Sequence, residues 1–554
     1  MGRQLPQEAY ARFDTYRLKK AKVMWVNFDW LASHGIDFPT EGLTSSFEER
    51  VLSAFAYMVP PSRGPPEAGD PDFDLNQHKD FYADRYGGSG MGTNQGSGRA
   101  GSAGKVQIKG IGTTPLVSTT QPFDHAHGGA SLEEAIREAI WGEINHAELP
   151  QGSNRVIAVI DTGTYTEWID GKRERRALII REDPLRPAHL IANLSSPDDH
   201  ARMATVDPLK LLPGPGGLAR RFRQYVARLA RVYGTAYGRR IFHGGFSPSN
   251  VEISGRFLDF GTETLQPGHG SIRILENTPS STWPDEQYYP LAQELWLSLR
   301  DRLSMNGADD GPPNSDIWRA AYEKAAMKEL ILASGFPPQL LDTQKRSLEY
   351  KKLQDAISAF KSVYDNNVQN VDLTMVPEPT NYHLPRIYMM LSELENPDSA
   401  SLSAALESQM PHHVIREAFV VAYLGLRSKL LTEASNEGVT HTAFSRLVRT
   451  RAKRINEPTP DLYRPQMRSD DVRLISEYMN SGDRSRIWNH IDDRVKQGRR
   501  SAHAHQLQAY QVLISETPEF LQKRYRVRVY DAKTDSEQEL VIPVHEDCDA
   551  TLLP

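Results

Sequence analysis

The chain has 554 residues, enough to bury a large core, and its length suggests roughly two to four domains. Hydrophobic residues make up 39% and charged residues 25%, and the net charge of −6 provides no basic field that would favour nucleic acid. No apolar run approaches the roughly eighteen residues that a membrane helix requires. The single cysteine, Cys548, excludes an internal disulfide and a cysteine zinc cluster. We therefore expect a cytoplasmic protein that neither enters a membrane nor binds nucleic acid.

The first part of the chain mixes short helical and extended patterns. Residues 23–27 have the composition of a strand, and residues 47–58 have helix-like apolar spacing. Residues 59–78 are rich in Pro, Gly and Asp, which predicts an exposed loop.

A glycine-rich stretch follows at residues 87–104. Within it, Gly96-Ser97-Gly98-Arg99-Ala100-Gly101 matches G-x-G-x-x-G, in which glycine lets the backbone approach phosphates closely. Taken alone, this pattern is equally consistent with a flexible linker. Residues 105–109 then alternate as a strand, and a lysine at its end, Lys109, suits contact with phosphate oxygens. The alternative is a solvated lysine on an edge strand.

Residues 131–149 are predicted to form a helix that begins with a capping box, Ser131 to Glu134. Its apolar residues form one buried stripe, and Glu138 is the glutamate that we expect to pair with Lys109, although most helix carboxylates are solvated. Apolar strands at 155–161 and 177–181 suit a sheet packed against this helix. Arg181, at the end of the second strand, and Arg186 suit contact with a nucleotide phosphate. The alternative for each, taken alone, is a surface arginine without a ligand.

A hinge is expected at residues 213–217, followed by an amphipathic helix from 218 to about 237. The segment His243-Gly244-Gly245-Phe246-Ser247-Pro248-Ser249-Asn250 then has the length of the kinase H-R-D-x-x-x-x-N motif, and Asp259-Phe260-Gly261 matches D-F-G. In kinases the Asn and the D-F-G Asp hold Mg²⁺, so Asn250 and Asp259 are predicted metal ligands. The kinase base position is Gly245, which has no side chain to accept a proton.

The remainder of the chain is predicted to be mostly helical, and its end extended. Strands are expected at 525–530 and 539–542 around a turn, as a terminal β-hairpin or a small appended sheet. Short basic patches occur at 446–454 and 496–500, but without interleaved aromatics in an acidic protein they are weak evidence for nucleic-acid binding. The helices are expected at residues 287–303, 317–334, 348–364, 402–408, 413–432, 442–455, 470–480 and 502–515.

Over roughly residues 20–300, these motifs in this order resemble the SelO (YdiU) family of protein adenylyltransferases, which have a protein-kinase-like fold. The matching stretches are residues 82–100 (YADRYGGSGMGTNQGSGRA), 106–115 (VQIKGIGTTP), 136–138 (IRE), Arg181 and 243–261 (HGGFSPSNVEISGRFLDFG). The resemblance implies that ATP binds in a flipped orientation and that AMP is transferred to a hydroxyl of a protein. It also implies that Lys109 and Arg181 hold the terminal phosphates, that Glu138 orients Lys109, and that Asn250 and Asp259 bind Mg²⁺ or Mn²⁺. The nucleotide site would be completed by Gly96, Gly98, Arg99 and Arg186.

The chain departs from the family pattern at the catalytic base. The family has an Asp immediately before the metal-binding Asn, and this chain has Ser249, whose hydroxyl has no useful basicity near neutral pH unless it is activated. Residues 118–130 also lack the arginines of the family's second glycine-rich stretch. One hypothesis is that His125 or His127, in that segment, replaces the lost carboxylate; two nearby loop histidines are otherwise unremarkable.

The sequence therefore predicts an α+β protein with a bilobal, protein-kinase-like core, a C-terminal helical extension and a terminal β-hairpin. Its function is expected to be ATP- and metal-dependent transfer of AMP to a protein or peptide acceptor, with Ser249, Lys109 and Glu138 at the catalytic centre. The alternative is an inactive pseudokinase that serves as a nucleotide-binding or scaffold module. The expected domains are an N-terminal extension (1–80), an N-lobe (81–212), a C-lobe with the metal-binding motifs (213–335), the helical extension (336–520) and the hairpin tail (521–554).

Overall fold

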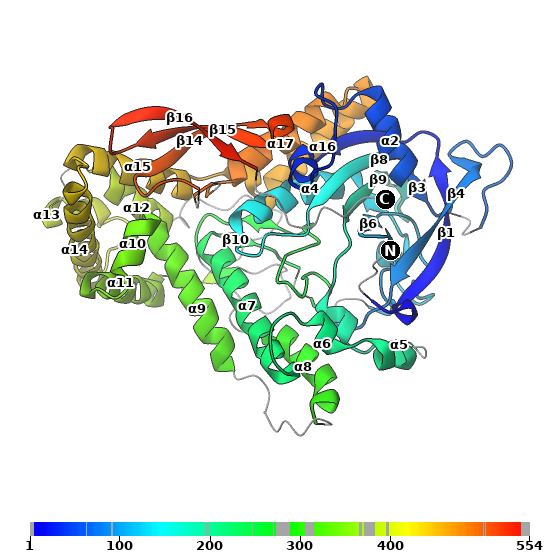
Figure 1. Cartoon of the computed structure of the whole chain (residues 1–554), viewed down its shortest axis with the longest axis horizontal. Helices are drawn as coiled ribbons and strands as arrows, with labels where there is room; N and C mark the ends of the chain where they lie inside the picture. The colour runs from blue at the N-terminus through cyan, green and yellow to red at the C-terminus, as the bar shows by residue number, and fades with distance from the viewer. Residues whose placement is uncertain are drawn as a thin grey trace.

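The computed structural model describes residues 5–61, 64–89, 92–193, 196, 199–245, 247–269, 271–272, 289–304, 315–364, 368–369, 383–394, 398–501, 503–504 and 506–544. The protein is a mixed α+β structure with a large antiparallel sheet, many helices and a separate three-stranded sheet near the C-terminus (Figure 1). Cys548 and Phe246 lie outside the described residues.

The large sheet has the strand order β2-β8-β9-β6-β5-β4-β1-β3, with β7 paired to β9, and every neighbouring pair is antiparallel. The predicted strands around Lys109 and at 155–161 and 177–181 are confirmed as β6, β8 and β9. Residues 1–80, the expected N-terminal extension, contribute three whole strands and most of a fourth, β4, to this same sheet. The strands are β1 (Tyr10–Leu18), β2 (Lys22–Val26), β3 (Tyr57–Met58), β4 (Phe73–Asp84), β5 (Ala100–Ala103), β6 (Val106–Lys109), β7 (Ala130–Ser131), β8 (Val156–Glu167) and β9 (Arg173–Glu182).

The loop predicted for residues 59–78 is wrong in its last part, because β4 already begins at Phe73. The alternation of apolar and polar residues at the start of β4 ends at once, because residues 76–80 are all polar and are exposed or half-buried. The strand forms because its backbone pairs along β1, a partner about 60 residues away, which the local sequence does not reveal.

Helix α4 (Leu132–Glu148) packs on β8 and β9, and it also contacts helices α16 (Arg464–Ser481) and α17 (Ser485–Gly498). The predicted helix is confirmed, but only half of its capping box forms. The Ser131 hydroxyl accepts the Glu134 backbone N–H at 3.0 Å, whereas the Glu134 side chain turns away to Arg99 and Lys109. Because α4 is covered on several sides, Glu138 and Glu143 are buried as well as its apolar stripe.

Helix α7 (Leu218–Gly238) is confirmed with its predicted core face buried, and it packs closely along α9. Two glycines permit this approach. A Cβ on Gly234 would lie 2.4 Å from the Tyr322 carbonyl oxygen, and a Cβ on Gly238 would lie 2.4 Å from Cβ of Glu329. The other elements up to this point are α1 (Phe28–Ser33), α2 (Ser45–Phe55), α3 (Phe123–Ala126), α5 (Asp199–Thr205), α6 (Pro208–Leu211), β10 (Ile241–Phe242), β11 (Thr264–Leu265), β12 (Ser271–Ile272) and α8 (Tyr289–Ser304).

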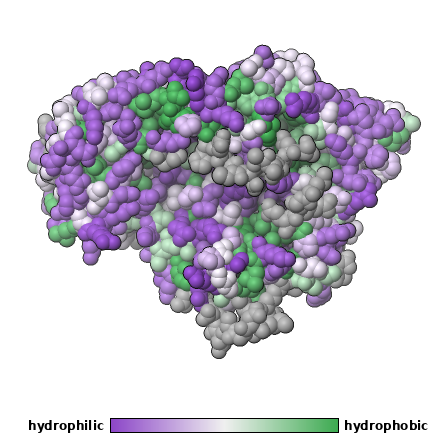
Figure 2. Space-filling view, in the orientation of Figure 1, coloured by the Kyte–Doolittle hydropathy of each residue, from purple (hydrophilic) through white to green (hydrophobic). Residues whose placement is uncertain are grey.

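The region after α8 is mostly helical, as predicted, and lies on the opposite side of the molecule from the large sheet until α16 and α17 return to it (Figure 1). In the orientation of Figure 1, hydrophilic residues cover most of the coloured surface of the molecule (Figure 2). No helix in the described ranges is long and apolar enough to span a bilayer. The elements are α9 (Ser315–Leu332), α10 (Pro338–Gln344), α11 (Leu348–Tyr364), β13 (Val368–Gln369), α12 (His383–Glu393), α13 (Ser399–Leu406), α14 (His413–Asn436), α15 (His441–Asn456), α16 (Arg464–Ser481) and α17 (Ser485–Gly498).

The terminal sheet consists of β14 (Gln511–Glu519), β15 (Arg524–Asp531) and β16 (Ser536–Pro543). The predicted pair of terminal strands is confirmed. The helix predicted at 502–515 is wrong, because its second part forms β14. A short apolar run such as Val512 to Ile514 suits either a helix or a strand, and pairing with β15 decides for the strand.

Candidate functional site

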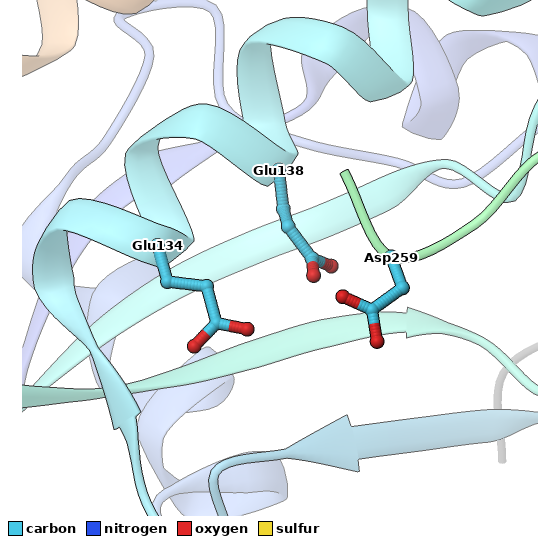
Figure 3. Close-up of side chains that lie close together, drawn as sticks. All are labelled: Glu134, Glu138 and Asp259. Atoms are coloured by element: carbon cyan, nitrogen blue, oxygen red, sulfur yellow. The ribbon is translucent and has the colours of Figure 1, made fainter. Parts of the chain in front are cut away.

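Lys109, the last residue of β6, lies at the centre of a cluster of carboxylates. Its side chain is 2% exposed, and its Nζ lies 2.5 Å from Oε1 of Glu138, 2.7 Å from Oε1 of Glu134 and 2.8 Å from Oδ1 of Asp259. Figure 3 shows Glu134 and Glu138 projecting from successive turns of α4 toward Asp259, which lies in the loop after β10. Two segments, α4 and the loop after β10, therefore place carboxylates around the ammonium group carried by a third, β6.

The charges in this cluster stabilise one another. Burial lowers the pKa of Lys109, but Asp259, Glu134 and Glu138 outweigh it and raise that pKa above its usual value. Burial likewise works to raise the pKa of Glu134, and Arg99 and Lys109 outweigh it, so that the pKa falls to about 2. The pKa of Asp259 is also held below its usual range, against burial, by Lys109, Arg99 and Arg181. Lys109, Glu134 and Asp259 are consequently charged at neutral pH.

Two of the predicted nucleotide-binding arginines, Arg99 and Arg181, join the cluster. Arg99 forms a two-pronged ion pair with Glu134, with both N–O distances at 2.9 Å, and also donates to the Gly129 carbonyl. Arg181 lies 3.4 Å from Oε2 of Glu138 and donates to the Gln107 side-chain oxygen at 2.8 and 3.1 Å. Both guanidiniums therefore border the Lys109 cluster.

Arg186 lies next to these groups but forms no ion pair with a carboxylate in the described structure. Its Nη1 donates to the Tyr86 hydroxyl at 3.2 Å and to the Ser249 carbonyl at 3.1 Å, and its Nη2 donates to Gln107 at 3.3 Å. The Nε atom is buried without a hydrogen-bond partner. A buried guanidinium with an unused donor and no paired carboxylate fits an anionic ligand.

His243 connects the two motifs that carry the predicted metal ligands. Its Nδ1 accepts the Gly245 backbone N–H at 3.2 Å, so its Nε2 carries the proton that is donated to the Leu258 carbonyl at 2.9 Å. Burial lowers the pKa of His243, which keeps the ring neutral. At Gly245 an added Cβ would lie 3.1 Å from the Asn250 amide nitrogen, so a side chain there would be tightly confined.

Ser249 and Asn250 lie in the same turn. The Ser249 side chain is buried, and its hydroxyl lies 2.6 Å from that of Ser247. Asn250 donates its amide N–H to the Gly245 carbonyl at 3.2 Å, which fixes the orientation of the amide. Asp259 adopts the left-handed conformation, with φ of 66°, in which its carboxylate reaches Lys109.

The predicted glycine-rich loop is packed against the protein itself. A Cβ on Gly96, whose φ is 145°, would lie 2.2 Å from the Asp84 carbonyl oxygen, and a Cβ on Gly98 would lie 2.9 Å from Val117. Internal packing therefore already requires small residues at both positions.

The two loop histidines differ in their surroundings. His125 is 70% exposed beside Asp124. His127 packs on Phe123 and Trp168 and accepts the Gly129 N–H, and burial with Arg99 and Arg176 lowers its pKa to about 4. His127 is therefore neutral at physiological pH, and its Nδ1 is already occupied by the Gly129 N–H.

Sequence reasoning missed three polar residues of the site. Glu134 was considered only as a cap, although its spacing of four residues from Glu138 places both on one helix face. Gln107 lies two residues before Lys109 on β6 and accepts hydrogen bonds from Arg181 and Arg186. Asp183 lies just after β9 and accepts the Ser102 hydroxyl at 2.5 Å, and burial and Asp84 raise its pKa to about 7. Nothing local in the sequence marks Asp183.

The acidic trio of Glu134, Glu138 and Asp259 has oxygen atoms within 4.8 Å of one another, a spacing suited to a metal ion. The Lys109 ammonium already contacts all three carboxylates, so a cation between them would have to displace it. Asp259 uses only Oδ1 for Lys109, and its second oxygen and the Asn250 amide oxygen are hard ligands of the kind that Mg²⁺ and Mn²⁺ prefer. These donor types fit the predicted metal pair.

No protein-family model matches this chain, and no curated protein sequence does.

Proposed function

We propose that this protein is a SelO-like protein adenylyltransferase with a two-lobed, kinase-like core, which binds ATP with Mg²⁺ or Mn²⁺ and transfers AMP to a hydroxyl of a protein or peptide. The observation that carries the proposal is the convergence of Lys109 with Glu138 and Asp259, a strand lysine, a helix glutamate and the Asp of the D-F-G motif. An ATP-dependent enzyme of this kind is expected in the cytoplasm.

The antiparallel sheet supports the kinase-like part of the proposal. Lys109 is on a strand of the sheet and Glu138 is on the helix packed against it, so the pair joins sheet and helix as a kinase requires. Asp259 lies in the loop after β10, which follows α7 in the sequence, and contacts the same lysine ammonium as Glu138.

Binding of the phosphates is assigned to Lys109, Arg181 and Arg186. Lys109 has a raised pKa and remains an ammonium, and Arg186 has a free Nε donor. Asn250 and Asp259 would hold the metal ion, which when bound neutralises charge on the phosphate oxygens. The acceptor hydroxyl oxygen attacks the α-phosphorus, and the bond to the pyrophosphate leaving group breaks.

Ser249 occupies the position of the family's base. In such transfers positioning and electrostatic stabilisation supply most of the rate, so a missing carboxylate slows the reaction without abolishing it. The Ser249 hydroxyl is hydrogen-bonded to Ser247, and among the residues that the structure describes it is paired with no carboxylate or histidine that would activate it.

The second candidate is a catalytically inactive pseudokinase. The lack of a carboxylate at Gly245 and Ser249 favours it, and so does the pairing of Lys109 with three carboxylates at once. Such a protein would bind a nucleotide or a partner without transferring a group.

Incubation of the purified protein with α-labelled and γ-labelled ATP, in the presence of Mg²⁺ or Mn²⁺, distinguishes these functions. Label from the α-phosphate on protein supports AMP transfer, and label from the γ-phosphate alone would replace the proposal with phosphorylation. The Asp259→Ala variant is the control for site-specific labelling. Thermal stabilisation by ATP and metal without either label would support the pseudokinase, and no stabilisation would reject nucleotide binding.

A further inference from the structure

The two basic segments of the sequence, residues 446–454 and 496–500, lie side by side in the fold. Arg454, in the last turn of α15, donates its Nε to the Arg500 carbonyl at 2.8 Å and its Nη2 to the Arg499 carbonyl at 3.0 Å. Arg500 in turn donates to the Ile455 carbonyl at 2.8 Å. Helix α15, which lies against β14 (Figure 1), thus brings its basic end to the segment that follows α17.

The positive charge gathered here exceeds the negative charge around it. Arg454 and Arg500 donate only to carbonyl oxygens, and Arg451 forms no hydrogen bond or ion pair within the described residues. Burial and Arg454 lower the pKa of Arg451 to about 10, which reflects a cation without a compensating anion. The nearby Glu148 is already used by Arg239 and by Ser501.

Capping of α15 does not account for these arginines. The C-terminus of a helix carries the equivalent of roughly half a negative charge. Arg451, Arg454 and Arg500 contribute three positive charges at that end, and Arg500 already donates to the Ile455 carbonyl. The end of the helix therefore offsets only part of this positive charge.

A cavity of about 350 Å³ opens at this place. Four cations line it, together with two carboxylates, Glu457 and Glu516. Glu516 contacts His503 at 2.8 Å and faces Arg499 at 3.7 Å, and its charge also acts on Arg454. Two carboxylates against four cations leave the lining of the cavity with an excess of positive charge. The four cations are Arg454, Lys496, Arg499 and Arg500.

We propose that this cavity binds the phosphate group of a small phosphorylated molecule. Guanidinium groups match the oxygens of a phosphate in geometry and charge, and Lys496 at the exposed side supplies a further donor. The site is distinct from the Lys109 cluster. The two lie toward different parts of α4, and its residues Glu138 and Glu148 are about 15 Å apart along the helix axis, at 1.5 Å per residue. Because Glu148 accepts the Ser501 N–H at 2.6 Å, the cavity adjoins the far end of the helix that carries Glu138.

Thermal unfolding of the full-length protein, with inorganic phosphate and ribose 5-phosphate added at constant ionic strength, tests the proposal. We expect each to raise the unfolding temperature more than chloride does. A larger effect of the ester identifies a phosphorylated metabolite as the ligand, and equal effects identify the free ion. Lys496→Gln and Arg454→Gln are each expected to raise the phosphate Kd by about tenfold, because each removes one charged contact.

Lys453→Gln is the matched control. Lys453 is an exposed cation on α15, next to Arg454, but it does not line the cavity. Lys109→Met must keep the phosphate response, which separates this site from the proposed nucleotide site. Lys496 is exposed, so its variant decides the question even if Arg454→Gln does not fold. A shift matched by chloride, or one that survives Lys496→Gln unchanged, overturns the proposal. Binding of single-stranded RNA that phosphate does not displace would replace it with a nucleic-acid surface.

Discussion

The Nζ of Lys109 and the Oδ1 of Asp259 lie 2.8 Å apart, although the two residues are separated by 150 positions in the chain. This ion pair ties the large sheet to the loop after β10, and the same ammonium contacts Glu138 of α4. The arrangement of three segments thus depends on a single buried cation.

Replacement of that cation should destabilise the protein. In Lys109→Met the three carboxylates lose the ammonium that contacts all of them, and Arg99 and Arg181 remain as the neighbouring cations. We expect a loss of about 3 kcal/mol in the free energy of unfolding at pH 7. The loss should shrink at pH 5, because the crowded carboxylates then take up protons. Urea denaturation measures both values, with Lys351→Met, an exposed site on α11, as the control. Equal stability of Lys109→Met and the parent protein would contradict the buried cluster.

The metal pair can be tested separately from the lysine. Asp259→Ala is expected to weaken metal-dependent ATP binding by at least about tenfold, because it removes a charged oxygen ligand. Asn250→Ala, which removes a neutral ligand, should have a smaller effect. Isothermal titration with ATP and Mg²⁺, compared with ATP alone, separates the metal contribution. If both variants bound ATP with metal as the parent does, the assignment of these two residues would be wrong.

Restoring a carboxylate at the base position should increase catalysis. Ser249→Asp is expected to raise the rate of AMP transfer by about 100-fold, since a positioned general base contributes on the order of 10²–10⁴. Ser247→Asp, two residues earlier in the same turn, is the matched control and should not accelerate transfer. The measurement is incorporation of label from α-labelled ATP. An unchanged rate in Ser249→Asp, with ATP binding preserved, would show that this position does not handle the proton.

Asp183 should make the stability depend on pH. Burial and the neighbouring Asp84 raise its pKa from 3.8 to about 7, whereas Ser102, Arg186 and Arg181 oppose the shift. A raised carboxyl pKa means that the folded state holds its proton more tightly, so stability present at low pH is lost as the pH rises toward 7. Asp183→Asn removes this penalty, and its advantage over the parent should grow by about 3 kcal/mol between pH 5 and pH 8, most of it below pH 7. Urea denaturation of the parent and the variant across that pH range measures the difference in their free energies of unfolding, with the exposed site Asp355→Asn as the control. A difference that stays constant with pH would refute the raised pKa of Asp183.

The sequence by itself determined the features that depend on neighbouring residues. The apolar stripe of α4, the core face of α7, the strand that ends at Lys109 and the last two strands of the chain all follow from side chains spaced at helical or strand periods. The spacing of Asn250 and Asp259 likewise identified a candidate site before any contact was known.

Tertiary structure alone decided the relationships between distant segments. It added Glu134 to the Lys109 cluster, turned Val512 to Ile514 into a strand by pairing them with β15, and joined β4 to β1. It also brought Arg454 and Arg500 together at one cavity. Periodicity determines which face of an element is apolar, but the element that covers that face is selected by packing and backbone pairing across the whole chain, and no local pattern records that choice.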